Sequence, residues 1–275
     1  MTVRLPAVAG MFYEARPERL EKDVKSYLEA SGAPGPRTAF GAIVPHAGYV
    51  YSGPVAGAVY ARLVIPGVAV ILCPNHTGRG SPASLEASDA WRTPLGDVPV
   101  NRRLSERLRE LAPSLEPDAA AHAREHSLEV QLPFLQARRP DIQIVPVCLG
   151  AHDLDLCREV GEAFAALRSE EKEPPLLLAS SDMNHYEPRA IGRRKDERAI
   201  ERIEAIDPEG LFTTVQSEGI SMCGFLPATA LLFAAARAGV TEARVVARRD
   251  SGDETGDTSS VVGYAGIIVG ELSIE

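Results

Sequence analysis

The sequence VAVILCPNH, residues 68–76, runs from an apolar segment through Cys-Pro-Asn into a histidine. A short, continuous apolar run that ends at a proline is typical of a β-strand covered on both faces. Two other segments repeat the arrangement, AIVPH at residues 42–46 and LLLASSDMNH at residues 176–185. Strands of this kind form the centre of parallel sheets, so the pattern favours an α/β fold.

Helical patterns separate these strands and complete an alternation of strands and helices. Further buried strands are predicted at residues 142–149, 244–247 and 264–269. Helices are predicted at residues 17–30, 54–63, 102–111, 127–138, 154–167, 189–206 and 227–238. The alternation predicts a three-layer α/β/α fold whose central sheet is mostly parallel or mixed. We expect a single domain over residues 1–275, with a mobile lid or a surface loop at the polar stretch 248–260.

The composition excludes several classes of protein. With 45% hydrophobic and 24% charged residues, the chain has the composition of a globular protein, not a disordered or fibrous one. A net charge of −9 without a long basic run makes nucleic acids and anionic membranes poor partners. No apolar run approaches the roughly 18 residues of a membrane span. Four cysteines in 275 residues form no disulfide framework, which suits the reducing cytoplasm where we expect this protein.

Three of the six histidines follow predicted strands. These are His46, His76 and His185, and Asp182 lies in the last of the three segments. Ligands of open α/β sheets bind outside the carboxyl ends of the strands. A single histidine there is more often an ordinary loop or core residue, but three together favour a metal or catalytic site. Two imidazoles plus an anionic third donor would leave coordination positions open to a substrate.

The third donor is open among Asp182, Glu125 and Cys223. Cys223 precedes a predicted helix, whose N-terminus would lower the pKa of the thiol. The alternative is that Cys223 is a small buried hydrophobic residue. Burial is what we expect for the other three cysteines, which lie inside apolar strand or helix patterns: Cys73, Cys148 and Cys157.

The segment 121–135, AHAREHSLEVQLPFL, carries two histidines and two glutamates. On a helix, Glu125 and Glu129 would share one face, and the two histidines another. The spacing is not that of the H-E-x-x-H metalloprotease motif. The plain interpretation is an amphipathic helix, whereas in the sharper one Glu125 and His126 reach into the same pocket and support the metal ligands. Similarly, Asp182 and His185 are either a proton-handling pair or parts of a turn.

Several ordered motifs resemble the Memo family, whose bacterial members are called AmmeMemoRadiSam system protein B. The resemblance runs through most of the chain and uses six segments. They are residues 4–13 (RLPAVAGMFY), 44–49 (VPHAGY), 74–76 (PNH), 125–134 (EHSLEVQLPF), 180–185 (SSDMNH) and 223–224 (CG). No G-x-G-x-x-G segment, P-loop or G-x-S-x-G elbow competes with this assignment.

The resemblance implies an α/β fold like that of the class III extradiol dioxygenases, with a vestibule at one end of the sheet. It implies iron or copper bound by His46, His76 and Cys223. His185 corresponds to the acid–base histidine of those enzymes, and Asp182 belongs to the same pocket. The dioxygenases use two histidines and a carboxylate, whereas the thiolate in this pattern is softer and favours Cu(I), zinc or low-valent iron. The family name also implies a link to an Amme-type protein and a radical-SAM enzyme.

Three functional hypotheses follow from these residues. The first is a dioxygenase-like, metal-dependent oxidoreductase acting on a small molecule, with His185 and Asp182 as catalytic residues. The second is a non-enzymatic protein that binds a metal or a partner and retains the pocket, because fold similarity does not transfer activity. The third is a zinc hydrolase with water on a His2Cys site.

Overall fold

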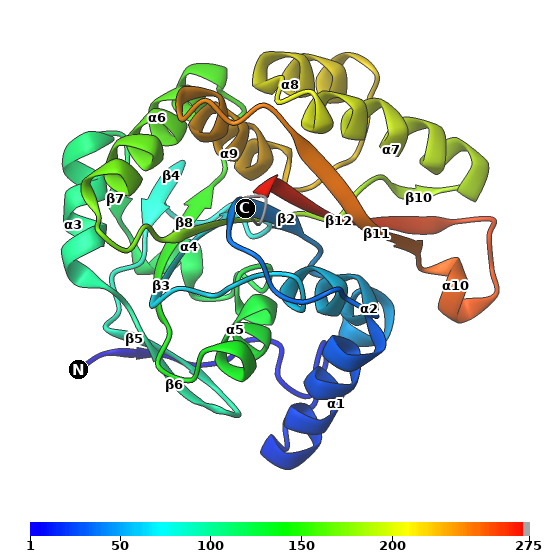
Figure 1. Cartoon of the computed structure of the whole chain (residues 1–275), viewed down its shortest axis with the longest axis horizontal. Helices are drawn as coiled ribbons and strands as arrows, with labels where there is room; N and C mark the ends of the chain where they lie inside the picture. Colours follow the sequence, from blue (N-terminus) through cyan, green and yellow to red (C-terminus); the bar gives the residue numbers. More distant parts are fainter. Residues whose placement is uncertain (272–275) are drawn as a thin grey trace.

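Four parallel strands form the centre of the main sheet in the computed structural model, which describes residues 1–271 (Figure 1). In spatial order they are β2 (Ala39–Val44), β9 (Leu176–Ser180), β3 (Val68–Pro74) and β8 (Gln143–Leu149). All four were predicted from the sequence. Nearly every residue in them is buried, because helices cover both faces of the sheet.

Antiparallel strands flank this parallel centre, so the sheet is mixed. On one side β12 (Val261–Glu271) pairs with β2, and both β11 (Ala243–Asp250) and β10 (His185–Glu187) pair with β12. On the other side lie β4 (Ala83–Leu85) and β7 (Glu116–Pro117). A separate three-stranded sheet contains β1 (Val3–Arg4), β5 (Ala90–Thr93) and β6 (Gly96–Pro99).

Helices form the two outer layers (Figure 1). One layer contains α1 (Pro17–Ala30), α2 (Tyr49–Tyr60) and α5 (Leu132–Arg138). The other contains α3 (Arg102–Leu111), α6 (Leu154–Glu170), α7 (Arg189–Glu204), α8 (Pro208–Ser217) and α9 (Phe225–Arg237). Two short helices lie in loops, α4 (Ala119–His122) and α10 (Gly252–Thr255). The molecule is therefore a single α/β domain with a mixed sheet between helices, as the sequence predicts.

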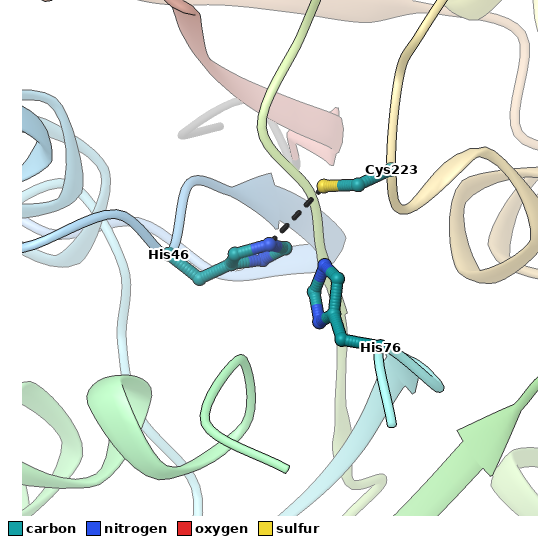
Figure 2. Close-up of side chains that lie close together, drawn as sticks. All are labelled: His46, His76 and Cys223. Atoms are coloured by element: carbon teal, nitrogen blue, oxygen red, sulfur yellow. Dashed lines mark hydrogen bonds between the residues drawn. The ribbon is translucent and has the colours of Figure 1, made fainter. Parts of the chain in front are cut away.

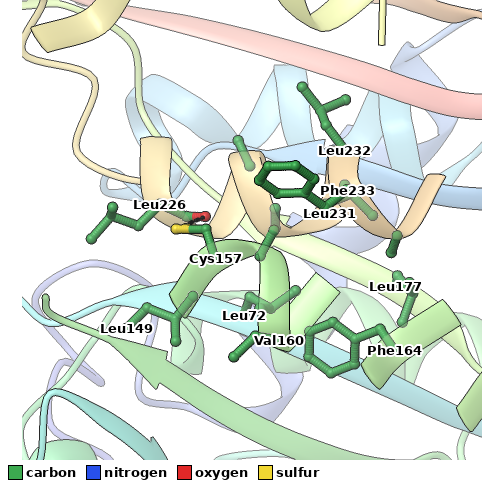
Figure 3. Packing of buried hydrophobic residues seen from close by; sticks show 14 of the residues in the cluster. Leu72, Leu149, Cys157, Val160, Phe164, Leu177, Leu226, Leu231, Leu232 and Phe233 are labelled. Carbon is green, nitrogen blue, oxygen red and sulfur yellow. Dashed lines mark hydrogen bonds between the residues drawn. The ribbon is translucent and has the colours of Figure 1, made fainter. Parts of the chain in front are cut away.

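Each helical layer buries its own hydrophobic cluster against the sheet. Figure 3 shows α9 and α6 packed over the sheet, with Phe164 and Leu231 fully buried near Leu72 of β3. The opposite cluster contains Tyr60 and Phe134, whose rings stack with centroids 5.2 Å apart. Burying a side chain of this size contributes roughly 1.5–3 kcal/mol to folding. Within residues 1–271, no helix combines the length and apolar character needed to cross a membrane.

Three predicted segments differ from the structure. Helix α2 begins at Tyr49 instead of residue 54. Pro54 is tolerated inside it, because the N–H that proline lacks would donate to the carbonyl of Val50, and Val50 is exposed. The predicted helix at 127–138 is a turn followed by a 3-10 turn (Glu129–Gln131) and α5, since Glu125 accepts hydrogen bonds from Ser127. The stretch 248–260 is not one continuous loop, because β11 continues to Asp250 and α10 follows it.

Candidate metal centre

Three neighbouring strands deliver the predicted site residues to one edge of the sheet. His46 lies two residues after β2, Asp182 two residues after β9, and His76 two residues after β3. Because β9 lies between β2 and β3, the segment that carries Asp182 leaves the sheet between the segments that carry the two histidines. His46, His76 and Asp182 therefore lie together at the carboxyl edge of the parallel strands, as expected from the sequence.

Cys223 reaches the same point from the loop between α8 and α9 (Figure 2). Its Sγ lies 3.1 Å from Nε2 of His46. Ligand atoms of His46, His76 and Cys223 lie within 4.8 Å of one another. Gly224 permits this approach, because a Cβ on that residue would overlap the carbonyl oxygen of Ser180 at the end of β9. The structure thus brings together the three residues predicted as metal ligands.

Hydrogen bonds at the Nδ1 atoms fix the tautomers of both histidines. The hydroxyl of Ser180 donates to the carbonyl oxygen of Ser127 at 2.6 Å, so it accepts from His46 Nδ1 at 2.9 Å. His76 Nδ1 donates to Glu125 Oε1 at 2.9 Å. Both Nε2 atoms consequently carry no hydrogen, which is the form that binds a metal, and that of His46 faces the Cys223 sulfur at 3.1 Å.

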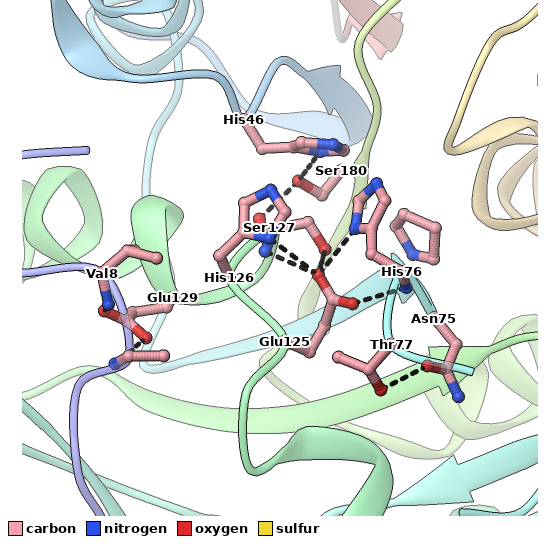
Figure 4. A network of polar contacts seen from close by, with 12 residues as sticks. Val8, His46, Asn75, His76, Thr77, Glu125, His126, Ser127, Glu129 and Ser180 are labelled. Atoms are coloured by element: carbon pink, nitrogen blue, oxygen red, sulfur yellow. Dashed lines mark hydrogen bonds and ion pairs between the residues drawn. The ribbon is translucent and has the colours of Figure 1, made fainter. Parts of the chain in front are cut away.

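Glu125 is the centre of the polar network behind His76 (Figure 4). Its Oε2 accepts from the backbone N–H of His76 at 2.7 Å, and its Oε1 accepts from both the N–H and the hydroxyl of Ser127. Burial disfavours ionisation, but the hydrogen bonds from His76 and Ser127 outweigh it and lower the pKa of Glu125 to about 2. Glu125 is therefore an ionised positioning residue, as the sharper interpretation of segment 121–135 predicts.

His126 forms part of the wall beside the ligands. Its ring stacks on that of His76 with centroids 4.7 Å apart and lies 5.6 Å from His46. His76, Glu125 and His126 also form a second group of close ligand atoms. Since Glu125 already accepts four hydrogen bonds, we assign this group a supporting role. The sequence left the role of His126 open, because only the turn at 125–127 directs it toward the cavity.

Electrostatics favour the neutral forms of His46 and Cys223 in the protein without a cation. Burial, together with the other histidines, holds the pKa of His46 well below its ordinary value. Burial and the neighbouring Asp182 raise the pKa of the Cys223 thiol well above its ordinary value. The lowered thiol pKa expected from the helix N-terminus is therefore wrong, because desolvation exceeds the helix effect. A thiolate ligand would form only as a metal displaces the proton.

Asp182 and His185 line the same cavity but have separate hydrogen-bond partners. Asp182 Oδ1 accepts from the backbone N–H of His46 at 2.7 Å. Burial raises the pKa of Asp182 to about 7, although the N–H of His46 opposes this shift. His185 Nδ1 donates to the carbonyl oxygen of Ser221 at 2.8 Å, and burial lowers its pKa. Asp182 and His185 therefore do not form the direct carboxylate–imidazole pair that one interpretation of the sequence predicts. Each side chain is held by its own partner.

The remaining histidines and cysteines lie away from this centre. His122 is buried with its ring 6.0 Å from that of Trp91, and His152 contacts Phe225. The three other cysteines are buried and free, as the sequence predicts: Cys73, Cys148 and Cys157.

An accessible cavity of about 1160 Å³ opens over the candidate ligands. His46, His76 and Cys223 lie on its wall, together with Asp182 and His185. Its outer wall comes from the segment before α1, the beginning of α2, and the region between β11 and β12. A cavity of this size admits a small organic molecule next to the metal ligands.

Comparisons with known proteins define the family. A family model described as Memo-like protein matches residues 4–268. A MEMO1 family protein of Methanopyrus kandleri is 42% identical over 277 residues, covering 96% of this chain and 98% of the relative. Another from Methanosarcina barkeri is 44% identical over 268 residues, covering 97% and 100%. The chain belongs to the Memo family, which confirms the resemblance found in its motifs.

A solved structure shares the fold. It is the crystal structure of an uncharacterized protein from Escherichia coli K12, which matches 76% of this chain and 88% of its own with a TM-score of 0.54. At 19% sequence identity, this similarity supports the fold alone.

Proposed function

We propose that this Memo family protein is a non-haem, metal-dependent oxidoreductase that resembles the class III extradiol dioxygenases and acts on a small molecule. One observation carries the proposal. Ligand atoms of His46, His76 and Cys223 lie within 4.8 Å of one another on the wall of an accessible cavity. Two imidazole nitrogens and a thiolate suit iron or copper, with zinc as a further candidate.

Both the positions and the tautomers of His46 and His76 suit binding of such a metal. His46 and His76 each use Nδ1 for a hydrogen bond inside the protein, which leaves Nε2 available. When bound, iron or copper would supply Lewis-acid and one-electron chemistry toward a substrate and O2. The cavity leaves room for a substrate beside these ligands.

His185 and Asp182 provide the catalytic groups of the proposal. His185 donates from Nδ1 to Ser221, so its Nε2 is free to accept a proton from a substrate hydroxyl. A positioned acid–base group of this kind contributes typically about 10²–10⁴ in rate. Asp182 holds the backbone of His46, and its pKa near 7 allows it to exchange a proton near neutral pH.

Metal analysis of anaerobically purified protein tests this proposal. We expect stoichiometric iron or copper in the wild type and in His185→Ala, and its loss in Cys223→Ser. Cys157→Ser is the matched control, because it removes a buried thiol from the packing of α6 against α9, away from the centre. This control should retain the metal.

Two outcomes would overturn the assignment. Stoichiometric zinc with neither iron nor copper would support a hydrolase that activates water on the His2Cys site. A wild type that takes up no metal after anaerobic reconstitution would point to a non-enzymatic binding protein. We also propose a cytoplasmic location, because the cysteines are free and suit a reducing compartment. On the resemblance alone, we propose a functional link to an Amme-type protein and a radical-SAM enzyme.

A further inference from the structure

Tyrosines gather around the cavity beside the candidate metal centre. Six of the seven tyrosines in the chain line it: Tyr13, Tyr27, Tyr49, Tyr51, Tyr186 and Tyr264. Met11 and Phe12 add apolar surface to the outer wall. Aromatic faces carry a negative quadrupole, so they attract the edges of other rings and also organic cations. The cavity wall is therefore suited to an aromatic ligand.

The charged residues on the outer wall are acidic. Among residues 1–271, the lining of the cavity contains no lysine or arginine, and its carboxylates away from the metal ligands are Glu14, Asp23 and Asp257. Glu14 pairs with Arg16 and Arg19 at 3.4 and 3.6 Å, outside the lining. The side chains of Asp23 and Asp257 are exposed to solvent. An anionic ligand would meet repulsion at this entrance, whereas a cation would be attracted.

Tyr186 stands at the mouth of this cavity in an unusual backbone conformation. Its φ of 58° lies in the left-handed region, which a bulky residue rarely adopts. The pairing of β10 with β12 shifts register between His185 and Glu187, so Tyr186 occupies a β-bulge. Bulges of this kind redirect a side chain, and strained residues persist where the surrounding structure imposes them.

The bulge leaves the Tyr186 ring exposed next to a proposed catalytic residue. The residue is 77% exposed, so its ring is accessible to a ligand. Its ring meets that of His185 edge-to-face, with centroids 5.6 Å apart. Met11 and Val50, also on the cavity wall, are among the few other exposed large apolar residues. Exposed apolar side chains that gather on one cavity wall are typical of a ligand-binding groove.

We propose that the cavity selects an aromatic molecule that carries a positively charged amine, and that Tyr186 is the specificity-determining residue that contacts its ring. The inference rests on the proposed function, because it treats the cavity as the place where the metal centre meets its substrate. Asp23 and Asp257 attract the amine at the entrance, and the tyrosines contact the ring.

Binding of matched phenols to the purified protein tests the selectivity for charge. Tyramine and 4-hydroxyphenylacetate share a phenol ring and differ in the charge of the side chain, and 4-ethylphenol is the neutral member. By ligand-observed NMR titration at low ionic strength, we expect tyramine to bind about fivefold or more tightly than 4-hydroxyphenylacetate. The preference should shrink in added NaCl. Equal binding, tighter binding of the anion, or no binding of any member would overturn the inference.

Substitutions at Tyr186 test its role separately. Tyr186→Phe should bind tyramine like the wild type, whereas Tyr186→Ala should weaken it roughly three- to tenfold through loss of the ring contact. Tyr186→Gly should weaken tyramine binding as much as Tyr186→Ala does. The glycine variant should unfold at a higher temperature than the alanine variant, because glycine adopts the left-handed conformation without strain. Unchanged tyramine binding in both Tyr186→Ala and Tyr186→Gly would remove Tyr186 from the site.

A second pair of variants tests the acidic entrance. Asp23→Asn should reduce the preference for tyramine, whereas Glu21→Gln should not, since both residues are exposed on α1 but only Asp23 lines the cavity. The metal content of each sample separates this inference from the proposed function. Protein that binds metal without preferring tyramine disproves the inference alone, and protein that prefers tyramine without binding metal disproves the oxidoreductase.

Discussion

At the residue scale, a single buried carboxylate decides whether His76 can serve as a ligand. Glu125 accepts from the backbone and from Nδ1 of His76, so it fixes both the position and the tautomer of the imidazole. Its own position is fixed by the N–H and hydroxyl of Ser127. Replacing a residue that orients a ligand in this way typically lowers metal affinity or activity by about 10–100-fold.

We therefore predict that Glu125→Gln lowers metal affinity by about 10–100-fold. An amide can place only one oxygen in this network, and its NH2 group would then face an N–H donor of His76 or Ser127. The measurement is the dissociation constant for the metal found in the wild type, obtained by competition with a chelator.

Glu86→Gln provides the control for this measurement. Glu86 is also a buried carboxylate, and it accepts from Ser88 and from the indole of Trp91 away from the cavity. Both variants should lose folding stability, but Glu86→Gln should keep the wild-type metal affinity. A Glu125→Gln protein with unaltered metal affinity would show that His76 does not need this carboxylate.

The sequence could predict which candidate ligands come together but not all of their surroundings. His46 and His76 are recognisable because each follows an apolar strand, and strands of this type end at one edge of a sheet. Cys223 was one of three candidate donors until the family resemblance singled it out, because a cysteine before a helix is equally compatible with a small buried hydrophobic residue. The exposed ring of Tyr186 follows from a register shift between β10 and β12, which no local pattern in the sequence encodes.

At the scale of elements, the loop before α9 must lie against the end of β9 for Cys223 to reach His46. Gly224 makes this contact, because a Cβ there would overlap the backbone of Ser180 and Ser181. We predict that Gly224→Ala lowers the free energy of unfolding by about 1–3 kcal/mol and weakens metal binding. Urea denaturation of the metal-free protein and metal analysis of the purified protein measure the two effects.

Gly192→Ala is the matched control for this substitution. Gly192 lies within α7, where a Cβ would meet only the amide nitrogen of Asn184 at 3.7 Å. Alanine should leave metal content unchanged and stabilise the helix by roughly 0.5–1 kcal/mol. If Gly224→Ala also had wild-type stability and metal content, close contact between this loop and β9 would not be required.

The strands at the centre of the sheet were easier to predict than those at its edges. β3 and β8 are continuous apolar runs, because both of their faces are covered. β4, β7 and β10 contain only two or three residues each, so their conformation comes from pairing with neighbours. β11 was predicted too short, because its polar residues Arg248–Asp250 lie on an edge strand that resembles a loop in sequence.

At the scale of the whole molecule, buried charges fasten distant segments to one another. Glu129 accepts from Arg4, from the backbone N–H groups of Ala7 and Val8, and from the hydroxyl of Tyr13. The first 13 residues are thereby fixed over the 3-10 turn next to the cavity, which they help to line. The family motif at residues 4–13 therefore has a structural explanation in this network.

Asp196 makes the stability of the whole molecule depend on pH. It is buried on α7 and accepts from the backbone N–H of Asn184 at 2.9 Å. Burial raises the pKa of Asp196 to about 6, and the nearby Asp250 and Glu197 add to this, while the N–H of Asn184 and Arg248 oppose it. The folded protein therefore holds this proton at pH values where the unfolded chain, with a pKa of 3.8, releases it.

The sign of the pH dependence follows from this difference. Below about pH 4 the carboxyl is protonated in both states, but between about pH 4 and 6 only the unfolded chain ionises, so stability falls as pH rises.

Asp196→Asn keeps an acceptor for Asn184 and cannot ionise. Its free energy of unfolding, minus that of the wild type, should increase by roughly 1–3 kcal/mol from pH 4 to pH 7. Glu201→Gln removes an exposed charge from the same helix at a residue that does not act on the pKa of Asp196, so it reports the effect of net charge alone. Urea denaturation from pH 4 to 7 measures the free energy of unfolding of both proteins. If the difference between Asp196→Asn and the wild type stays constant over this range, the carboxyl ionises equally in the folded and unfolded states, despite its burial.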